Sequence, residues 1–193
     1  MRSALRVFAV VVALVALTGF GIPRQRVEYT LTPLLDHGTL KAVQVDVIFR
    51  GDASGRTILN LPNEWGGQTE LYHAIHDLKP ISNAAIADGE DAAQRVLTYR
   101  PRALVHFQYV VFQDWVGEPR AENGNPYRPI VQPGYFHFIG STFLVTPLLD
   151  DTTPTDVQIR NLPRGWHFAS DLEHHGLELG RIAPSIAVAG DFR

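Results

Sequence analysis

The fold of this protein is decided between residues 27 and 49, where the sequence reads VEYTLTPLLDHGTLKAVQVDVIF. Apolar residues occupy every second position from Val27 to Leu31 and again from Val43 to Phe49. Successive side chains of a strand point to opposite faces, so this alternation predicts two strands that each bury one face. The intervening Asp36-His37-Gly38-Thr39 is typical of a tight turn that joins a hairpin.

Further strands are predicted along the rest of the chain, most of them bounded by Pro or Gly. They cover residues 56–61, 95–99, 104–112, 135–139, 142–146, 156–162 and 185–189. About nine short strands at this spacing, without alternating βαβ units, predict an all-β fold, an antiparallel β-sandwich. One short helix of two or three turns is expected where Leu71, Ile75 and Leu78 follow helical spacing.

The segment 104–112 is apolar on both faces of its predicted strand. Leu104, Val110 and Phe112 lie on one face, and Val105, Phe107, Tyr109 and Val111 lie on the other. Two apolar faces are expected of a strand that is covered on both sides. The outer cover is either another layer of this domain or a docked partner, and the sequence leaves both open.

The N-terminus resembles an export signal. Arg2 and Arg6 precede an apolar run from Val7 to Leu17, which ends near Thr18-Gly19-Phe20-Gly21. This layout predicts a secretory signal peptide over residues 1–21, followed by one β domain over 22–193. The localisation that follows is exported, either periplasmic or extracellular. The alternative is an uncleaved membrane anchor at residues 7–20, although the run is short for a bilayer span.

Composition excludes several classes of function. The chain has 193 residues, 17 basic and 20 acidic side chains, and no cysteine. Without a basic run that could follow a phosphate backbone, nucleic acid is not an expected partner. Without cysteine, thiol nucleophiles and cysteine-based zinc sites are impossible.

Two histidine clusters are candidate metal sites. His73 and His76 lie three residues apart beside Asp77, and Glu173 precedes His174 and His175. The first lacks the Glu of a His-Glu-x-x-His motif, and adjacent histidines on an extended chain point in opposite directions. We therefore expect solvated side chains rather than metal ligands at both places, and no cofactor.

The remaining polar motifs favour structural interpretations. Gly51-Asp52-Ala53-Ser54-Gly55 has Ala where a serine nucleophile would stand, so a connection between strands is expected. Asp150-Asp151 and Glu90-Asp91 are expected in polar turns and do not suggest a pair of catalytic carboxylates. No catalytic residue is predicted.

Large aromatic residues offer an alternative, a binding surface. They are Trp65, Trp115, Trp166, Tyr127 and Tyr135, and the long Pro-rich segment 117–133 contains one of them. Such residues can stack on sugars or peptides, but we expect them to pack in the core. Long loops are uncommon unless they are functional or disordered.

Several segments together resemble a known family. Tyr29-Thr30-Leu31-Thr32-Pro33 is followed by a strand closing on Leu61-Pro62 and by Trp65-Gly66-Gly67. Later, Phe143-Leu144-Val145-Thr146-Pro147 precedes Leu162-Pro163-Arg164-Gly165-Trp166, and Gly190-Asp191-Phe192-Arg193 closes the series. This order resembles the β-rich N-terminal domain of the glycyl aminopeptidase family of zinc metallopeptidases. The segment at Trp65 departs from the commoner Trp-x-Pro-Gly form.

The resemblance implies a non-catalytic domain. In that family the β domain precedes a thermolysin-like catalytic domain whose zinc-binding His-Glu-x-x-His is absent from these 193 residues. The expected partner is a peptidase catalytic domain, in cis or missing, against which this domain packs while it helps to shape the substrate cleft. The alternatives are a stand-alone exported module that binds a peptide or glycan, and a small hydrolase or metalloenzyme built on the histidines.

Overall fold

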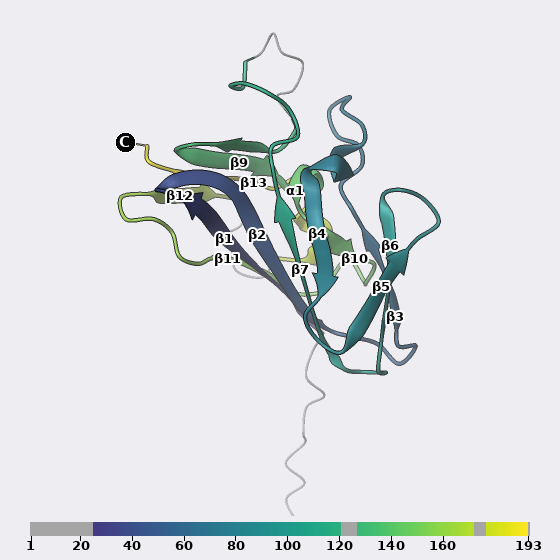
Figure 1. The fold of residues 1–193 in the computed structure, drawn as a ribbon. Coiled ribbons are helices and arrows are strands. Elements are labelled where there is room, and N and C mark those ends of the chain that lie inside the picture. The colour runs from purple at the N-terminus through teal and green to yellow at the C-terminus, as the bar shows by residue number, and fades with distance from the viewer. Residues whose placement is uncertain (1–24, 121–126, 172–176, 193) are drawn as a thin grey trace, which may run out of the picture.

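The computed structural model describes residues 25–120, 127–171 and 177–192. Strands dominate these residues and form three sheets (Figure 1). The predicted all-β sandwich is confirmed. The predicted signal segment lies outside the described residues, and no helix within them is long and apolar enough to span a membrane.

The largest sheet has five strands in the order β11-β1-β2-β7-β4. They are β1 (Val27–Asp36), β2 (Thr39–Arg50), β4 (Ile75–Pro80), β7 (Leu104–Val111) and β11 (Thr155–Ile159). The predicted β1–β2 hairpin is confirmed, with Asp36 paired to Thr39 across a turn in which His37 and Gly38 have positive φ. β11 runs parallel to β1, so the expectation of purely antiparallel sheets is wrong at this edge.

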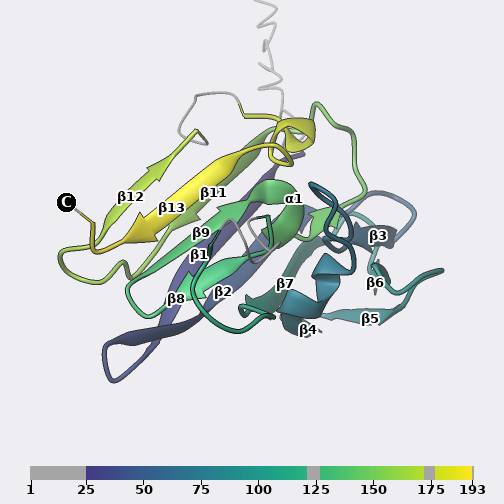
Figure 2. The same ribbon diagram turned by 90° about the horizontal axis from the view of Figure 1, so that it is seen from above.

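The second and third sheets each have four strands, in the orders β10-β3-β6-β5 and β12-β13-β9-β8. The second contains β3 (Arg56–Asn60), β5 (Ala84–Asp88), β6 (Gln94–Tyr99) and β10 (Thr146–Pro147). The third contains β8 (Ile130–Gln132), β9 (Tyr135–Ile139), β12 (His167–Ser170) and β13 (Ile186–Gly190). Figures 1 and 2 show the third sheet over β1 and β2, and the second sheet beside β4 and β7.

One hydrophobic core joins the three sheets. The rings of Phe138 and Phe143 stack with centroids 4.4 Å apart beneath the third sheet, and Phe49 meets Tyr99 of the second sheet edge to face. Aromatic side chains contribute large buried areas and prefer such offset and edge-on geometries. The inner face of the five-stranded sheet is therefore closed by the two smaller sheets.

Two buried tyrosines anchor the chain that crosses between the sheets. The hydroxyl of Tyr29 donates to the Val145 carbonyl, and the hydroxyl of Tyr109 donates to the Phe143 carbonyl while accepting from the Val145 amide. Burial raises the pKa of both phenols well above the usual value, so both stay protonated donors. The hydroxyls supply partners to backbone groups that would otherwise be buried unpaired.

The helix predicted around Leu71, Ile75 and Leu78 is wrong. A 3-10 helix, η1, covers only Leu71–Ala74, and Ile75 and Leu78 lie on β4. A bulge between His76 and Lys79, with Asp77 at φ 53°, adds a residue to the strand. The extra residue turns Ile75 and Leu78 toward the same side, so a bulged strand imitates helical spacing.

The strand predicted at 142–146 is also wrong over most of its length. The short helix α1 (Gly140–Phe143) occupies its start, and a second 3-10 helix lies at Leu179–Arg181. Gly140 approaches the carbonyl of Ile182 so closely that an added Cβ would lie 1.7 Å from its oxygen. The turn follows from this close approach rather than from the strand propensity of the Thr, Phe and Val nearby.

Candidate functional site

His73 and His76 each lie beside an aromatic ring. His73 lies on η1 with its ring 4.7 Å from the Tyr72 ring, and His76 lies on β4 with its ring 5.0 Å from Phe112. Within the described residues, no group of three His, Asp, Glu or Cys side chains is placed to hold a metal ion. The second cluster, at residues 173–175, lies outside the described residues.

A shallow groove of about 600 Å³ runs beside these histidines. Its lining combines apolar, aromatic and charged side chains from η1, β4 and the end of the second sheet: Leu61, Tyr72, His73, Ile75, His76, Asp77, Leu78 and Arg95. Arg95 donates to the carbonyls of Ala92 and Gln94. The groove therefore presents both apolar and charged side chains.

The other polar motifs serve as turns. In the 51–55 connection, Asp52 accepts from the amide and hydroxyl of Ser54, and the added Cβ of Gly51 would lie 2.0 Å from the Tyr99 ring. Asp150 accepts from the amide and hydroxyl of Thr152, which lowers the pKa of its carboxyl. The predicted strand connection and polar turns are confirmed as local structure.

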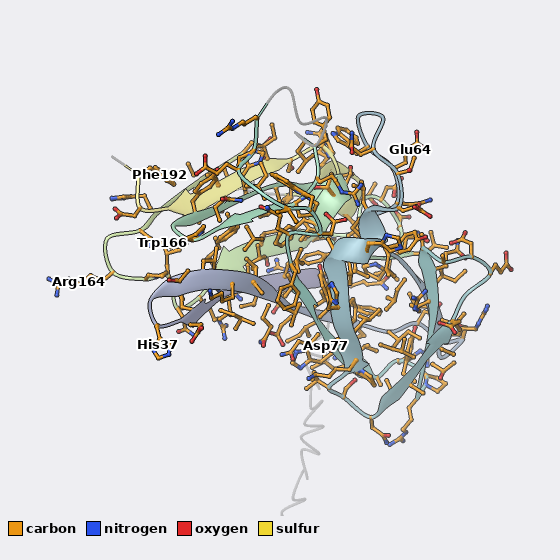
Figure 3. The ribbon with its side chains drawn as sticks, turned by 45° about the horizontal axis from the view of Figure 1, so that its top comes forward. His37, Glu64, Asp77, Arg164, Trp166 and Phe192 are labelled. Carbon is orange, nitrogen blue, oxygen red and sulfur yellow. The ribbon has the colours of Figure 1, made fainter. Side chains whose placement is uncertain are left out.

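The tryptophans are half-buried, so the expectation that they pack in the core holds only in part. Trp166 packs against the core from its edge (Figure 3), whereas Trp65 lies in a turn and the Trp115 indole donates to the Pro129 carbonyl. Among the described residues, no ring contact joins the three tryptophans into one platform. Tyr127, which is 43% exposed, lies against Gly66.

One surface of the molecule is formed by residues 65–70, 112–117 and 127–132, and we call it the Val116 surface. An ion pair lies beneath it: Arg128 Nε donates to both carboxylate oxygens of Asp114, at 3.0 and 3.1 Å, and Arg128 Nη1 donates to the Thr69 carbonyl. The side chains of Asp114 and Arg128 are only 8% and 14% exposed. Hydrogen bonding to Asp114 raises the pKa of Arg128. One ion pair therefore joins two chain segments to the turn that follows Trp65.

Two glutamines hold the tip of this surface. Gln113 Nε2 donates to the carbonyls of Trp115 and Gly117, at 3.0 and 2.9 Å, and its oxygen accepts from the Val131 amide. Gln132 Nε2 donates to Gln113 Oε1 and to the Gly117 carbonyl. The side chain of Val116, between these fixed points, is 98% exposed.

Sequence reasoning did not find this arrangement. The Pro-rich sequence of the segment 117–133 favours a long loop, yet the segment contains β8, and residues 121–126 lie outside the described residues. Asp114 and Arg128 are separated by fourteen positions, with no motif to link them. The roles of Gln113 and Gln132 likewise cannot be predicted from a single sequence, because they depend on which backbone groups lie nearby.

A second polar cluster lies on the outer face of the five-stranded sheet. Asp46 on β2 accepts from Gln44, Gln108 and His106, the last at 2.7 Å. Burial raises the pKa of the Asp46 carboxyl, but these hydrogen bonds together lower it more, so the pKa lies below the usual value. The carboxylate is therefore charged at neutral pH, and its hydrogen bonds to His106 and Gln108 connect β2 to β7.

The outer face of the segment 104–112 is exposed at both of its ends. Val105, Phe107, Tyr109 and Val111 are buried on its inner face, whereas Leu104 is 60% exposed and Phe112 is 37% exposed. Of the two covers that the sequence left open, a further layer of this domain is thus excluded over the described residues at both ends of this strand.

This architecture is similar to that of part of a known protein. Over 86% of its length the chain matches a solved structure of an aminopeptidase N family protein from Idiomarina loihiensis, with a TM-score of 0.64 and 16% sequence identity. The chain shares its fold with part of that aminopeptidase family protein. It spans 29% of the length of that protein, so most of the larger chain has no counterpart in these 193 residues.

The expected similarity in fold to one part of an aminopeptidase is thus confirmed. An M1 zinc metallopeptidase from Deinococcus radiodurans is also similar, with a TM-score of 0.45 and 13% identity over 86% of this chain and 41% of that one. A TM-score below 0.5 does not establish a shared fold. No protein-family model and no curated protein sequence matches the chain.

Proposed function

We propose that this chain is an exported, non-catalytic β domain that packs against a peptidase catalytic domain and helps to shape its substrate cleft. The observation that carries the proposal is the fold match, which includes nearly the whole of this chain but less than a third of the aminopeptidase family protein. A domain that corresponds to one part of a larger enzyme has a natural partner in the remainder of that enzyme.

The Val116 surface is where such a partner would pack. Its segments carry three exposed apolar residues: Phe112, Val116 and Tyr127. Interface cores are enriched in aromatic and apolar residues surrounded by a polar rim. The ion pair of Arg128 and Asp114 and the two glutamines fix the backbone in advance, so docking loses little conformational entropy.

An activity assay tests the non-catalytic part of this proposal. The purified chain, with zinc added, is incubated with glycyl and other aminoacyl p-nitroanilides. We expect no release of nitroaniline above buffer, because the sequence lacks a His-Glu-x-x-His motif and the described residues hold no three metal-binding side chains close together. Zinc-dependent turnover that increases with protein concentration would refute it.

The cleft-shaping part needs the complete enzyme. With the peptidase domain present, Val116→Asp is expected to raise KM or to separate the two domains, whereas Thr98→Asp on the exposed face of β6 is expected to do neither. Equal effects of the two substitutions would contradict a role for the Val116 surface in docking.

A further inference from the structure

One end of the five-stranded sheet carries a cluster of positive charge. It consists of residues 50–56, 79–83 and 100–104, which we call the basic end, where β2 and β4 finish and β7 begins (Figure 1). These segments contain five basic residues, Arg50, Arg56, Lys79, Arg100 and Arg102, and a single acidic residue, Asp52. Because the whole chain has more acidic than basic residues, 20 against 17, its charge is distributed asymmetrically.

Hydrogen bonds fix the three segments relative to one another. Arg50 Nη1 donates to the Arg102 carbonyl at 3.1 Å, and the Arg102 amide donates to the Asp52 carbonyl at 2.7 Å. The Ile81 amide donates to the His106 carbonyl on β7 at 2.8 Å. The charges therefore project from one structured surface rather than from separate loops.

The positive charges are not neutralised within the domain. Across the described residues, no ion pair includes any of the five basic side chains of this end. Asp52 is held locally by the amide and hydroxyl of Ser54, and the hydroxyl bond is the main cause of the lowered pKa of its carboxyl. The basic end thus presents a net positive surface to solvent.

Two large apolar side chains stand among these charges. Leu104 is 60% exposed and lies opposite Arg50 across the β2–β7 pairing. Ile81 is 47% exposed, and its bond to His106 places it beside β7, two residues along from Leu104. Exposed apolar residues surrounded by cationic ones suit an interface that is anionic at its surface and apolar just below it.

We infer that the basic end binds the surface of a bilayer that contains anionic phospholipids. Clustered Lys and Arg are attracted to the negative surface potential of such a bilayer, and Ile81 and Leu104 can enter the boundary of the acyl chains. Nucleic acid would use the same charges but would leave these two apolar residues unused. The inference does not depend on the presence of a peptidase domain.

The start of the described chain lies at the same end. Gln25 Nε2 donates to the Arg50 carbonyl at 3.2 Å, so residue 25 is adjacent to the basic surface. In the sequence, the apolar run from Val7 to Leu17 comes shortly before this point. A chain that leaves a membrane through that run would enter the domain at its basic end.

Vesicle co-sedimentation tests the inference with the full chain, so that residues 1–24 contribute equally to every variant. The lipids are phosphatidylcholine alone and phosphatidylcholine mixed with phosphatidylglycerol. The test variant is Lys79→Glu/Arg100→Glu, and the matched control is Arg160→Glu/Arg164→Glu, which makes the same change in net charge at exposed sites away from this end. Circular dichroism confirms that both variants are folded.

We expect phosphatidylglycerol to strengthen binding and added salt to weaken it. The test variant should lose affinity for the mixed vesicles by at least about tenfold, while the control stays within about twofold. Leu104→Ser should weaken binding without changing its salt dependence. The inference is overturned if phosphatidylglycerol has no effect, if the two charge variants bind equally, or if the chain binds a DNA duplex and not the vesicles.

Discussion

The two ends of β7 present apolar side chains to solvent in different ways. At the basic end, Leu104 lies opposite Arg50, and the segments are held by backbone hydrogen bonds and by one bond from the Arg50 side chain. At the Val116 surface, the side chains of Gln113, Arg128 and Gln132 hold the backbone. A surface fixed by side chains has a defined shape and suits one protein partner, whereas a surface of clustered positive charges with exposed apolar residues suits an anionic bilayer.

The largest effect on stability is expected on removing the ion pair of the Val116 surface. Asp114→Ala leaves the guanidinium of Arg128 largely buried without its partner, and we expect it to lower the free energy of unfolding by about 2–4 kcal/mol. Asp156→Ala removes the exposed partner of Arg26 and should cost less than about 1 kcal/mol. Urea denaturation measures both, and equal losses would show that the Val116 surface is not held by its side chains.

Two neighbouring glycines test whether Tyr127 packs on the turn of the Val116 surface. Gly66 has φ 57°, and an added Cβ would lie 2.3 Å from the Tyr127 ring, so Gly66→Ala should cost about 2 kcal/mol through backbone strain and displacement of the ring. Gly67 has φ 79° but open space around it, so Gly67→Ala should cost about 1 kcal/mol from strain alone. Thermal unfolding compares the two variants. A larger loss in Gly67→Ala would mean that Tyr127 does not pack on this turn.

A pH dependence is expected between the two ends, at Asp46. Because the folded state lowers the pKa of this carboxyl, its contribution to stability is present above the unfolded value near 3.8 and is lost as the pH falls through the folded value. Asp46→Asn should therefore reduce the difference in urea midpoint between neutral and acidic solution. An unchanged difference would show that other carboxyls cause the acid dependence.

The smallest effect on stability is expected at Val116 itself. Val116→Asp changes a side chain that is 98% exposed, so the free energy of unfolding should change by less than about 0.5 kcal/mol. The same variant is expected to impair docking of the peptidase domain. A clear loss of stability in the isolated chain would mean that Val116 has a structural role in this domain.

The sequence predicted the regular part of the fold. The alternation from Val27 to Phe49 gave both strands of the hairpin, because each strand buries one face in the expected register. Prediction from the spacing of apolar residues failed at β4, where the bulge at Asp77 changes that spacing. It also failed at Gly140, where the close approach to Ile182 determines the backbone conformation. Period-based reasoning detects regular elements and cannot detect an inserted residue or a distant contact.

The candidate surfaces could be predicted from the sequence only in part. The two apolar faces of the segment 104–112 indicated a cover beyond the inner core, and the exposure of Leu104 and Phe112 gives the location of that uncovered face. By contrast, the basic end joins residues from three connections, and no single stretch of sequence contains its charges. Its existence depends on the pairing of β2, β7 and β4.

Isolation of the protein from its source cells tests the central claim most directly. An antibody to this chain recovers the native species, and mass spectrometry then measures its mass and sequences every polypeptide in it. The account predicts a peptidase domain with a His-Glu-x-x-His segment, either continuous with this chain or held in a stable complex with it. A species that contains these 193 residues and no peptidase would contradict it.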